Sequence, residues 1–302
     1  MVSSPNFDPN TVEEQWSWLT SEENTTQNMM NHATQGTYPP GSTFKLITLL
    51  EYIRENPDTW QDFHYTCTGT YTNGDYVVNC HDGVAHGELY IYGILGMSCN
   101  GAFDTIAQTL NSTKWQKLAE DFGYNQSDRS QVDFPYKKSH FDIASDDSVW
   151  SRMQLAIGQG TTTVTPLLNL MMYAAIANDG VMMTPYLVDH YLDADGNVVE
   201  QTKPKALRSV CTKAEAELMD EFLTYVITNG TAAAGGSQYA RVSGKTGSAQ
   251  YDSTKNYHAW FCGYGTNDVS EIAVCVMIEK GGAGGIVAAP VAGQIFDYYF
   301  SR

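Results

Sequence analysis

The pattern of apolar and polar positions divides the chain into a largely helical middle and a strand-rich end. Apolar residues recur at a spacing near 3.6 through most of the middle, which predicts amphipathic helices. Pro39-Pro40-Gly41 precede the first of these helices and Pro57 follows it, as expected at helix boundaries. The predicted helices cover residues 42–55, 89–95, 101–110, 113–122, 165–178, 212–228 and 290–300.

Alternation of apolar and polar residues replaces the helical period near the end of the chain. The runs ARVSGKTGSAQY, YHAWFCGYG and EIAVCVMIE lie between residues 240 and 280, which predicts an antiparallel meander. Residues 58–88 are expected to form loops and short strands, and residues 183–199 a hairpin that turns at Asp195-Gly196. This order of elements indicates one domain over residues 1–302, of the α/β class, with an antiparallel sheet flanked by helices and a mostly helical subdomain.

The charge balance narrows the range of partners. The chain carries 34 acidic and 17 basic residues, a formal net charge of −17, and has no run rich in Lys or Arg. Nucleic acids and anionic lipid surfaces are therefore not expected as direct partners. The most apolar stretch, residues 167–177, is too short to span a bilayer and contains Asn169, so it is predicted to be a core helix.

One candidate nucleophile stands at the start of a predicted helix. The stretch YPPGSTFK, residues 38–45, places Ser42 at the helix N-terminus. Lys45 follows on the same face, with the two Cβ atoms roughly 5–6 Å apart. A desolvated lysine can accept the serine proton, and the helix N-terminus favours a developing oxyanion. Alone, this pattern is weak, because a capping serine beside a solvated lysine looks the same.

Two further motifs strengthen the catalytic interpretation. SCN at residues 98–100 puts a hydroxyl and an amide two positions apart between predicted helices, where they can relay a proton and hold an amide substrate. KTG at residues 245–247 begins a predicted strand, and Gly247 would let a ligand backbone approach closely. The three motifs occur in the order S-x-x-K, S-x-N and K-T-G, which is specific where each motif alone is not.

With these motifs the chain resembles the transpeptidase domain of class B penicillin-binding proteins, among the penicillin-recognising serine acyltransferases. The resemblance covers nearly the whole chain, through VSSPNFDPN, NHATQGTYPPGSTFK, IGQG, VTP, HAWFCGYG, GGAGG and APVAGQIF. It implies a peptidoglycan D,D-transpeptidase, whose full-length relatives carry a membrane helix and a non-catalytic pedestal ahead of this domain. The implied location is the extracytoplasmic face of the bacterial membrane, with the anchor outside this fragment.

The resemblance also implies a role for each motif residue. Ser42 would attack the carbonyl of the penultimate D-Ala of a stem peptide, with Lys45 as the base, and form an acyl-enzyme as the terminal D-Ala leaves. Ser98 and Lys245 would pass the proton to the leaving amine, and Asn100 would hydrogen-bond the donor amide. An amine from a neighbouring stem would resolve the ester as a crosslink. β-Lactams would mimic the D-Ala-D-Ala end and trap the serine.

The K-T-G strand would bind the carboxylate end of the donor. Thr246 and Ser248 flank Gly247 and would hold that carboxylate, while the backbone N–H groups of Ser42 and Ser248 would form the oxyanion hole. Catalysis is expected to need no cofactor. The implied partners are stem peptides, β-lactam antibiotics and a glycan polymerase of the wall-building complex.

Thiols and imidazoles gather in the sequence just before the S-x-N motif. Cys67 and the run CHDGVAH at residues 80–86 supply the donor types of a tetrahedral, structural zinc site. If residues 80 and 82 point the same way along a strand, the ligands are Cys67, Cys80, Asp82 and His86, with His81 or His64 as substitutes. A Cys67–Cys80 disulfide and free thiols are the competing interpretations. The other cysteines are interpreted as small buried hydrophobic residues: Cys99, Cys211, Cys262 and Cys275.

Three alternative functions share these motifs. A serine β-lactamase must deacylate quickly, which in one major class requires a glutamate in an E-x-x-L-N segment. Neither Leu110-Asn111 nor Leu168-Asn169 follows such a glutamate, which disfavours this alternative. A D,D-carboxypeptidase would pass the same acyl-enzyme to water, and a β-lactam sensor would stay acylated and signal. The motifs alone do not separate the last two from a transpeptidase.

Overall fold

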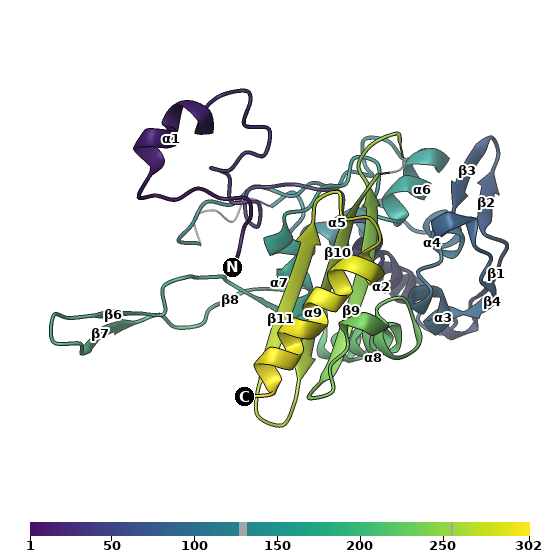
Figure 1. Ribbon diagram of the computed structural model, residues 1–302. Helices are drawn as coiled ribbons and strands as arrows, with labels where there is room; N and C mark the ends of the chain where they lie inside the picture. Colours follow the sequence, from purple (N-terminus) through teal and green to yellow (C-terminus); the bar gives the residue numbers. More distant parts are fainter. Residues whose placement is uncertain (127–131, 255) are drawn as a thin grey trace.

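A three-stranded antiparallel sheet forms the centre of the fold (Figure 1). The computed structural model describes residues 1–126, 132–254 and 256–302. Strands β9 (Arg241–Gln250), β10 (Tyr257–Thr266) and β11 (Glu271–Ile278) pair in the order β11-β10-β9. The alternating runs of the sequence therefore form the predicted meander, and the α/β class with helices on both sides of the sheet is confirmed.

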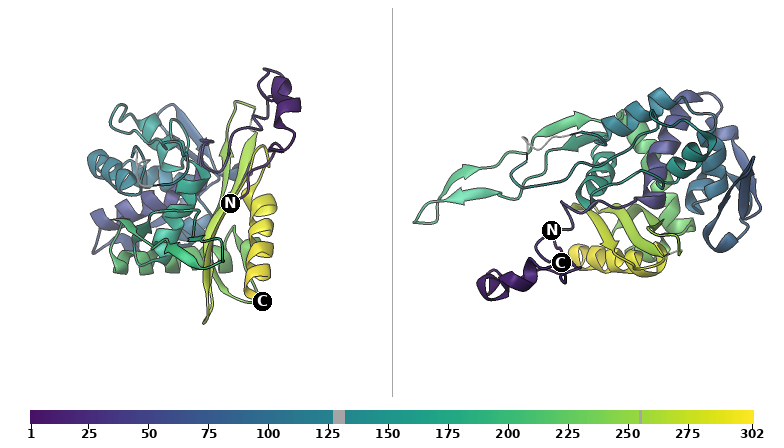
Figure 2. Two further views of the ribbon diagram at one scale, coloured as in Figure 1. Left: turned by 90° about the vertical axis from the view of Figure 1, so that its left-hand side faces the viewer. Right: turned by 90° about the horizontal axis from the view of Figure 1, so that it is seen from above.

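Helices cover both faces of this sheet (Figure 2). Helix α9 (Gly284–Phe300) lies on one face, where Phe296 meets Phe261 of β10 with ring centroids 6.2 Å apart. Helices α7 (Pro166–Ala177) and α8 (Lys213–Asn229) pack against the sheet from the other side. The predicted start of the last helix at Pro290 is wrong, because α9 already begins at Gly284, whose backbone N–H donates to Ser248 Oγ at 3.0 Å.

A mostly helical subdomain lies beside the sheet. Its helices are α2 (Lys45–Glu55), α3 (Ile91–Gly96), α4 (Asn100–Ala107), α5 (Ser112–Asp121) and α6 (Val149–Ala156). Two small two-stranded sheets border it: β1 (His64–Cys67) with β4 (Gly87–Tyr90), and the hairpin of β2 (Thr70–Asn73) with β3 (Tyr76–Asn79). The predicted helix over residues 89–95 is wrong at its start, because Leu89 pairs with Tyr65 in the β1–β4 sheet.

Two segments project from this body (Figure 1). The first carries α1 (Val12–Leu19), which the sequence pattern did not predict. The second is an arm formed by β6 (His190–Leu192) and β7 (Val198–Gln201), joined through a turn that contains Gly196 at φ +85°. At the base of the arm β5 (Val181–Met183) pairs with β8 (Ala206–Ser209), so the predicted hairpin is wrong at its start: Met183 belongs to β5 and not to the β6–β7 hairpin. Among the described helices, none has the length and apolarity needed to cross a bilayer.

Candidate active site

Ser42 lies on one turn of 3-10 helix, Gly41–Phe44, which runs directly into α2. The α-helix proper begins at Lys45, three residues later than the sequence pattern predicted. Thr43 and Phe44 are fully buried, whereas Ser42 is partly exposed. Thr43 and Phe44 therefore anchor the turn in the core, while the side chain of Ser42 remains accessible to solvent.

Helix α7 supports the nucleophile turn, Gly41–Phe44, through two hydrogen bonds to Thr43. The amide of Asn169 donates to Thr43 Oγ1 at 3.1 Å, and the hydroxyl of Tyr173 donates to the Thr43 carbonyl at 2.9 Å. Phe44 stacks on Phe141 with ring centroids 4.9 Å apart. The roles of Asn169 and Tyr173 as supports of the site were not predicted from the sequence. The available signal was a buried amide within an otherwise apolar helix.

Strand β9 approaches the same turn so closely that a side chain would not fit between them. A Cβ atom on Gly247 would lie 2.9 Å from the Pro40 carbonyl oxygen and 3.3 Å from Thr43 Cγ2. Glycine was predicted here because it permits close approach of a ligand backbone. In the structure the group that approaches is the nucleophile turn itself, so Gly247 sets the spacing between K-T-G and S-x-x-K.

Two buried lysines converge on the hydroxyl of Ser98. Lys45 Nζ donates to the Ser98 carbonyl at 2.8 Å, to Ser98 Oγ at 3.3 Å and to Asn100 Oδ1 at 2.6 Å. Lys245 Nζ donates to Ser98 Oγ at 2.9 Å and to the Thr246 carbonyl at 3.1 Å. Ser98 itself has a left-handed backbone, φ +54°, which only a well-determined environment maintains in a residue with a side chain.

Burial governs the electrostatics of these lysines. Neither lysine is exposed to solvent, and burial lowers the pKa of Lys45 to about 8. Burial, followed by the charge of Lys45, lowers the pKa of Lys245 well below its usual range. Lys45 donates three hydrogen bonds to Ser98 and Asn100, as an ammonium group does. Within the described residues it makes none to Ser42 Oγ.

The remaining motif side chains lie in the same region and have partners of their own. Asn100 donates from its amide to the Asn79 carbonyl at 2.7 Å, and the hydroxyls of Thr246 and Thr231 are 3.0 Å apart. Ser248 Oγ accepts the hydrogen bond from the first residue of α9. β9 is one of the two edge strands of the three-stranded sheet, so some of its backbone N–H groups face away from β10. The structure thus gathers all three motifs around one point.

Three cysteines and a histidine converge beneath the S-x-N loop. The Sγ atom of Cys67 lies 3.6 Å from Cys80 Sγ and 3.4 Å from His86 Nδ1, and Cys80 Sγ lies 3.8 Å from Cys99 Sγ. The four donor atoms all lie within 4.8 Å of one another. Pairing of β1 with β4 brings Cys67 opposite Gly87, next to His86. A hydrogen bond with Cys99 lowers the pKa of the Cys80 thiol.

This cluster adds Cys99 to the donors expected from the sequence. β3 ends at Asn79, and His81–Gly83 form a 3-10 turn, so the assumed strand through residues 80–82 is wrong. The side chain of Asp82 lies outside the described part of the structure. Within that part, the fourth group is Cys99, interpreted from the sequence as a buried hydrophobic residue, and neither substitute belongs to the cluster. Those substitutes were His64 and His81.

The cluster has the dimensions of a tetrahedral metal site. With Zn–S bonds of about 2.3 Å and Zn–N bonds of about 2.0 Å, tetrahedral ligands stand about 3.5–3.8 Å apart. Three of the six distances between donor atoms, 3.4 to 3.8 Å, agree with this, and the other three are no longer than 4.8 Å. A disulfide would use two of the four donors only.

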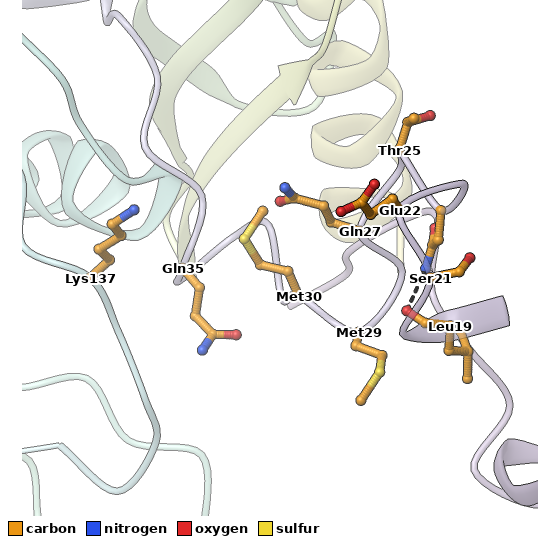
Figure 3. Close-up of a pocket in the computed structure, with 10 residues that line it drawn as sticks. Leu19, Ser21, Glu22, Thr25, Gln27, Met29, Met30, Gln35 and Lys137 are labelled. Atoms are coloured by element: carbon orange, nitrogen blue, oxygen red, sulfur yellow. Dashed lines mark hydrogen bonds between the residues drawn. The ribbon is translucent and has the colours of Figure 1, made fainter. Parts of the chain in front are cut away.

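A separate hollow lies near the N-terminus (Figure 3). Its volume is about 800 Å³. Met29 and Met30 line the hollow from the N-terminal part of the chain, and Lys137 lines it from a separate segment. Its lining residues include none of the three motifs and bring no nucleophile and base together. The hollow is therefore not part of the candidate active site.

The fold and the site together define a class of protein: an α/β protein with a serine at a helix start and two buried lysines, as in serine acyltransferases. Residues 1–297 match the family described as the penicillin-binding protein transpeptidase domain. The chain belongs to this family, which confirms the resemblance found in the sequence.

Relatives with known names agree with this family. The chain is 26% identical to the peptidoglycan D,D-transpeptidase PbpA of Mycolicibacterium smegmatis over 309 residues, covering 96% of the chain and 62% of PbpA. A structure of penicillin-binding protein A from M. tuberculosis, a ceftriaxone acyl-enzyme complex, matches with a TM-score of 0.85 and 25% identity, over 96% of this chain and 68% of that chain.

A second solved structure is an assembly. It is described as the structural coordination of polymerization and crosslinking by a peptidoglycan synthase complex, and it matches with a TM-score of 0.83 and 25% identity. The match covers all of this chain and 53% of that chain. Since the chain spans only part of the length of these relatives, it corresponds to one portion of each.

Proposed function

We propose that this chain is the catalytic domain of a peptidoglycan D,D-transpeptidase that works through a Ser42 acyl-enzyme. The observation that carries the proposal is the convergence of Lys45 and Lys245 on one hydroxyl, Ser98 Oγ. A partly exposed hydroxyl between two buried lysines of lowered pKa can pass a proton in either direction. Membership of the transpeptidase family and the acyl-enzyme structure of a similar protein support it.

Acylation begins when Lys45 loses a proton. The neutral amine keeps two N–H donors and gains a lone pair, so it must give up one of its three hydrogen bonds. The longest is the one to Ser98 Oγ. The freed lone pair, one helical turn from Ser42, accepts the serine proton as its oxygen attacks the carbonyl of the penultimate D-Ala. The N–H groups of Ser42 and Ser248 stabilise the oxyanion.

Collapse of the tetrahedral intermediate requires a proton on the leaving amine of the terminal D-Ala. Ser98 donates its proton to that amine and takes another from Lys245. Asn100 binds the donor amide, and Thr246 and Ser248 bind its carboxylate. The amine of a second stem peptide then attacks the ester and completes the crosslink. A β-lactam would follow the first half of this path only, because its leaving group stays tethered.

We also propose a cellular setting. Residues 1–302 act as one catalytic domain, held at the extracytoplasmic face of the membrane by an anchor outside these residues. A glycan polymerase of the wall-building complex supplies the strands to be crosslinked. The match to a chain of a peptidoglycan synthase complex supports this partner.

The test of the proposed function is intact-protein mass spectrometry with benzylpenicillin, followed over hours, together with a crosslinking assay on stem peptides. A transpeptidase is expected to hold one stable adduct and to join two stem peptides. An adduct that disappears while the drug is consumed would instead identify a β-lactamase. Release of D-Ala without crosslinks would identify a carboxypeptidase, and a stable adduct without turnover of stem peptide would identify a sensor.

We further propose a structural zinc ion bound by Cys67, Cys80, Cys99 and His86. The donor types and their spacing support it. Four protein ligands would leave no position for water, so the ion would hold structure rather than act in catalysis. Cys99 stands between Ser98 and Asn100. Zinc would therefore fix the loop that presents both residues to Lys45.

Zinc content of the purified protein tests this second proposal. We expect about one zinc per chain, and a large loss of zinc in Cys99→Ser, because three ligands bind far more weakly than four. Removal of the metal is expected to lower the melting temperature and to slow acylation by benzylpenicillin. The matched control is Cys211→Ser, a buried cysteine outside the cluster. The proposal is wrong if the protein, as first purified, contains no zinc and has a Cys67–Cys80 disulfide instead.

A further inference from the structure

A second pair of thiols lies within the central sheet. Cys262 of β10 and Cys275 of β11 are directly opposite each other in the antiparallel register, and their sulfur atoms are 3.1 Å apart. Opposite residues of antiparallel strands have Cα atoms about 4.5–5.5 Å apart. A disulfide requires Cα separations of about 4.4–6.8 Å. The backbone is therefore already placed for a bond between the two sulfurs.

The pair lies on the active-site face of the sheet. Cys262 is also the register partner of Lys245 in β9, and side chains of directly opposite residues share one face. Phe261, its neighbour in β10, points the other way, toward Phe296 of α9. The thiols therefore lie on the side of the sheet where Lys245 reaches Ser98.

The two thiols differ in their surroundings. Cys262 is fully buried, whereas Cys275 is partly exposed. Cys262 donates its S–H to the sulfur of Cys275, and burial raises the pKa of the Cys262 thiol well above its usual range. A reagent from solvent would therefore meet Cys275 first, and Cys262 would react only with a sulfur already beside it.

We propose that Cys262 and Cys275 form a cross-strand disulfide when the chain meets a disulfide oxidant. The Cys275 thiolate attacks one sulfur of the oxidant and expels the first thiolate. Cys262 then loses its proton to that thiolate, attacks Cys275 Sγ and expels the second. Two protein thiols are oxidised, and one disulfide of the oxidant is reduced to two thiols, so atoms and electrons balance.

The proposal is independent of the proposed catalytic function and of the zinc cluster. In the part of the chain that the structure describes, the metal-type cluster contains Cys67, Cys80 and Cys99 and excludes both sheet cysteines. Without further donors around them, Cys262 and Cys275 have the geometry of a disulfide pair rather than of a metal site.

The bond would join the last two strands behind the K-T-G strand. It would close the loop from Cys262 to Cys275 and remove conformations from the unfolded chain. For a loop of this size in a chain of this length, the melting temperature is expected to rise by about 5 °C. The sheet that carries Lys245 would then be held together covalently.

The experiment compares the reduced protein with the same protein incubated with oxidised glutathione, zinc being kept in the buffer. Free thiols are then blocked with N-ethylmaleimide in denaturant. Trypsin alone is uninformative, because no Lys or Arg lies between the two cysteines. A protease that cleaves at Asp268 separates them unless they are bonded. We expect the two fragments to remain joined until a reductant is added, and the melting temperature to be about 5 °C higher.

Two variants serve as controls. Cys275→Ser is expected to give no joined fragments and no rise in melting temperature after oxidation, whereas Cys211→Ser should behave as the parent chain. The proposal is overturned if both sheet cysteines of the oxidised parent carry maleimide. A glutathione adduct on Cys275 that never resolves to the internal bond would overturn it equally.

Discussion

Replacing Ser42 by alanine is expected to abolish covalent labelling by benzylpenicillin. The substitution removes the only atom that the proposed mechanism uses to attack the lactam carbonyl, so the rate of adduct formation should fall by on the order of 10⁴-fold or more. Intact-protein mass measured over hours gives the result directly. A labelled Ser42→Ala protein would remove Ser42 from the mechanism.

The structure makes this substitution easy to interpret. Ser42 is partly exposed, and its hydroxyl makes no hydrogen bond to another described residue, so its loss should change the free energy of unfolding by about 0.5 kcal/mol or less. An unchanged melting temperature would exclude misfolding as the reason for lost labelling. Ser270→Ala, in the turn between β10 and β11, is the matched control and should label like the parent chain.

The motif residues could be predicted from the sequence because each motif is short and local. Ser42 and Lys45 are one turn apart whatever the rest of the chain does, and alternation alone predicts the strand that carries Lys245. What the sequence did not contain was their convergence on Ser98 Oγ. That convergence depends on contacts over long separations, such as the hydrogen bond between Lys245 and Ser98, which spans 147 residues. Before the structure was known, only the resemblance to a family indicated that Ser98 and Lys245 act together.

The sequence could not predict that Cys99 joins the cysteine cluster, and the reason is the same. Cys99 joins Cys80 because β3 ends at Asn79 and because α4 begins directly after Cys99. Neither boundary has a periodic signal, since the segment from 58 to 88 contains only short strands. An extended conformation was the natural assumption for residues 80–82, and it selected Asp82. The sequence therefore predicted the place and the donor types of the cluster, while the fourth donor required the structure.

The support of the nucleophile turn shows a further limit. Asn169 and Thr43 are 126 residues apart, and each looks ordinary in its own segment. Buried amides are normally hydrogen-bonded, so the sequence indicates that Asn169 has a partner in the core. The identity of the partner depends on how α7 packs beneath the turn, and periodicity does not reveal packing between elements.

The rate of acylation is expected to rise with pH and to level off above a pH of about 8. Lys45 acts as a base only when it is neutral, and its pKa is about 8. At pH 7 only about one molecule in ten would carry the neutral amine. The second-order rate constant with benzylpenicillin should therefore increase nearly tenfold for each pH unit below the transition. The profile can be measured by stopped-flow or mass-based kinetics between about pH 5.5 and about pH 9.5.

A substitution of Lys45 tests whether the pH dependence of acylation comes from this lysine or from another group. Lys45→Met keeps an unbranched side chain of similar length and removes the base, so the rate should fall by about 10³-fold and lose its transition near pH 8. Because Met leaves Asn100 Oδ1 and the Ser98 carbonyl without their donor, the melting temperature must be measured alongside. Lys114→Met, an exposed lysine on α5, should keep the parent profile. A flat profile in the parent chain would show that Lys45 is already neutral or that another group takes the proton of Ser42. The unchanged rate of Lys45→Met would identify the second case, and the choice of base would then pass to Ser98 with Lys245, which are joined by a hydrogen bond.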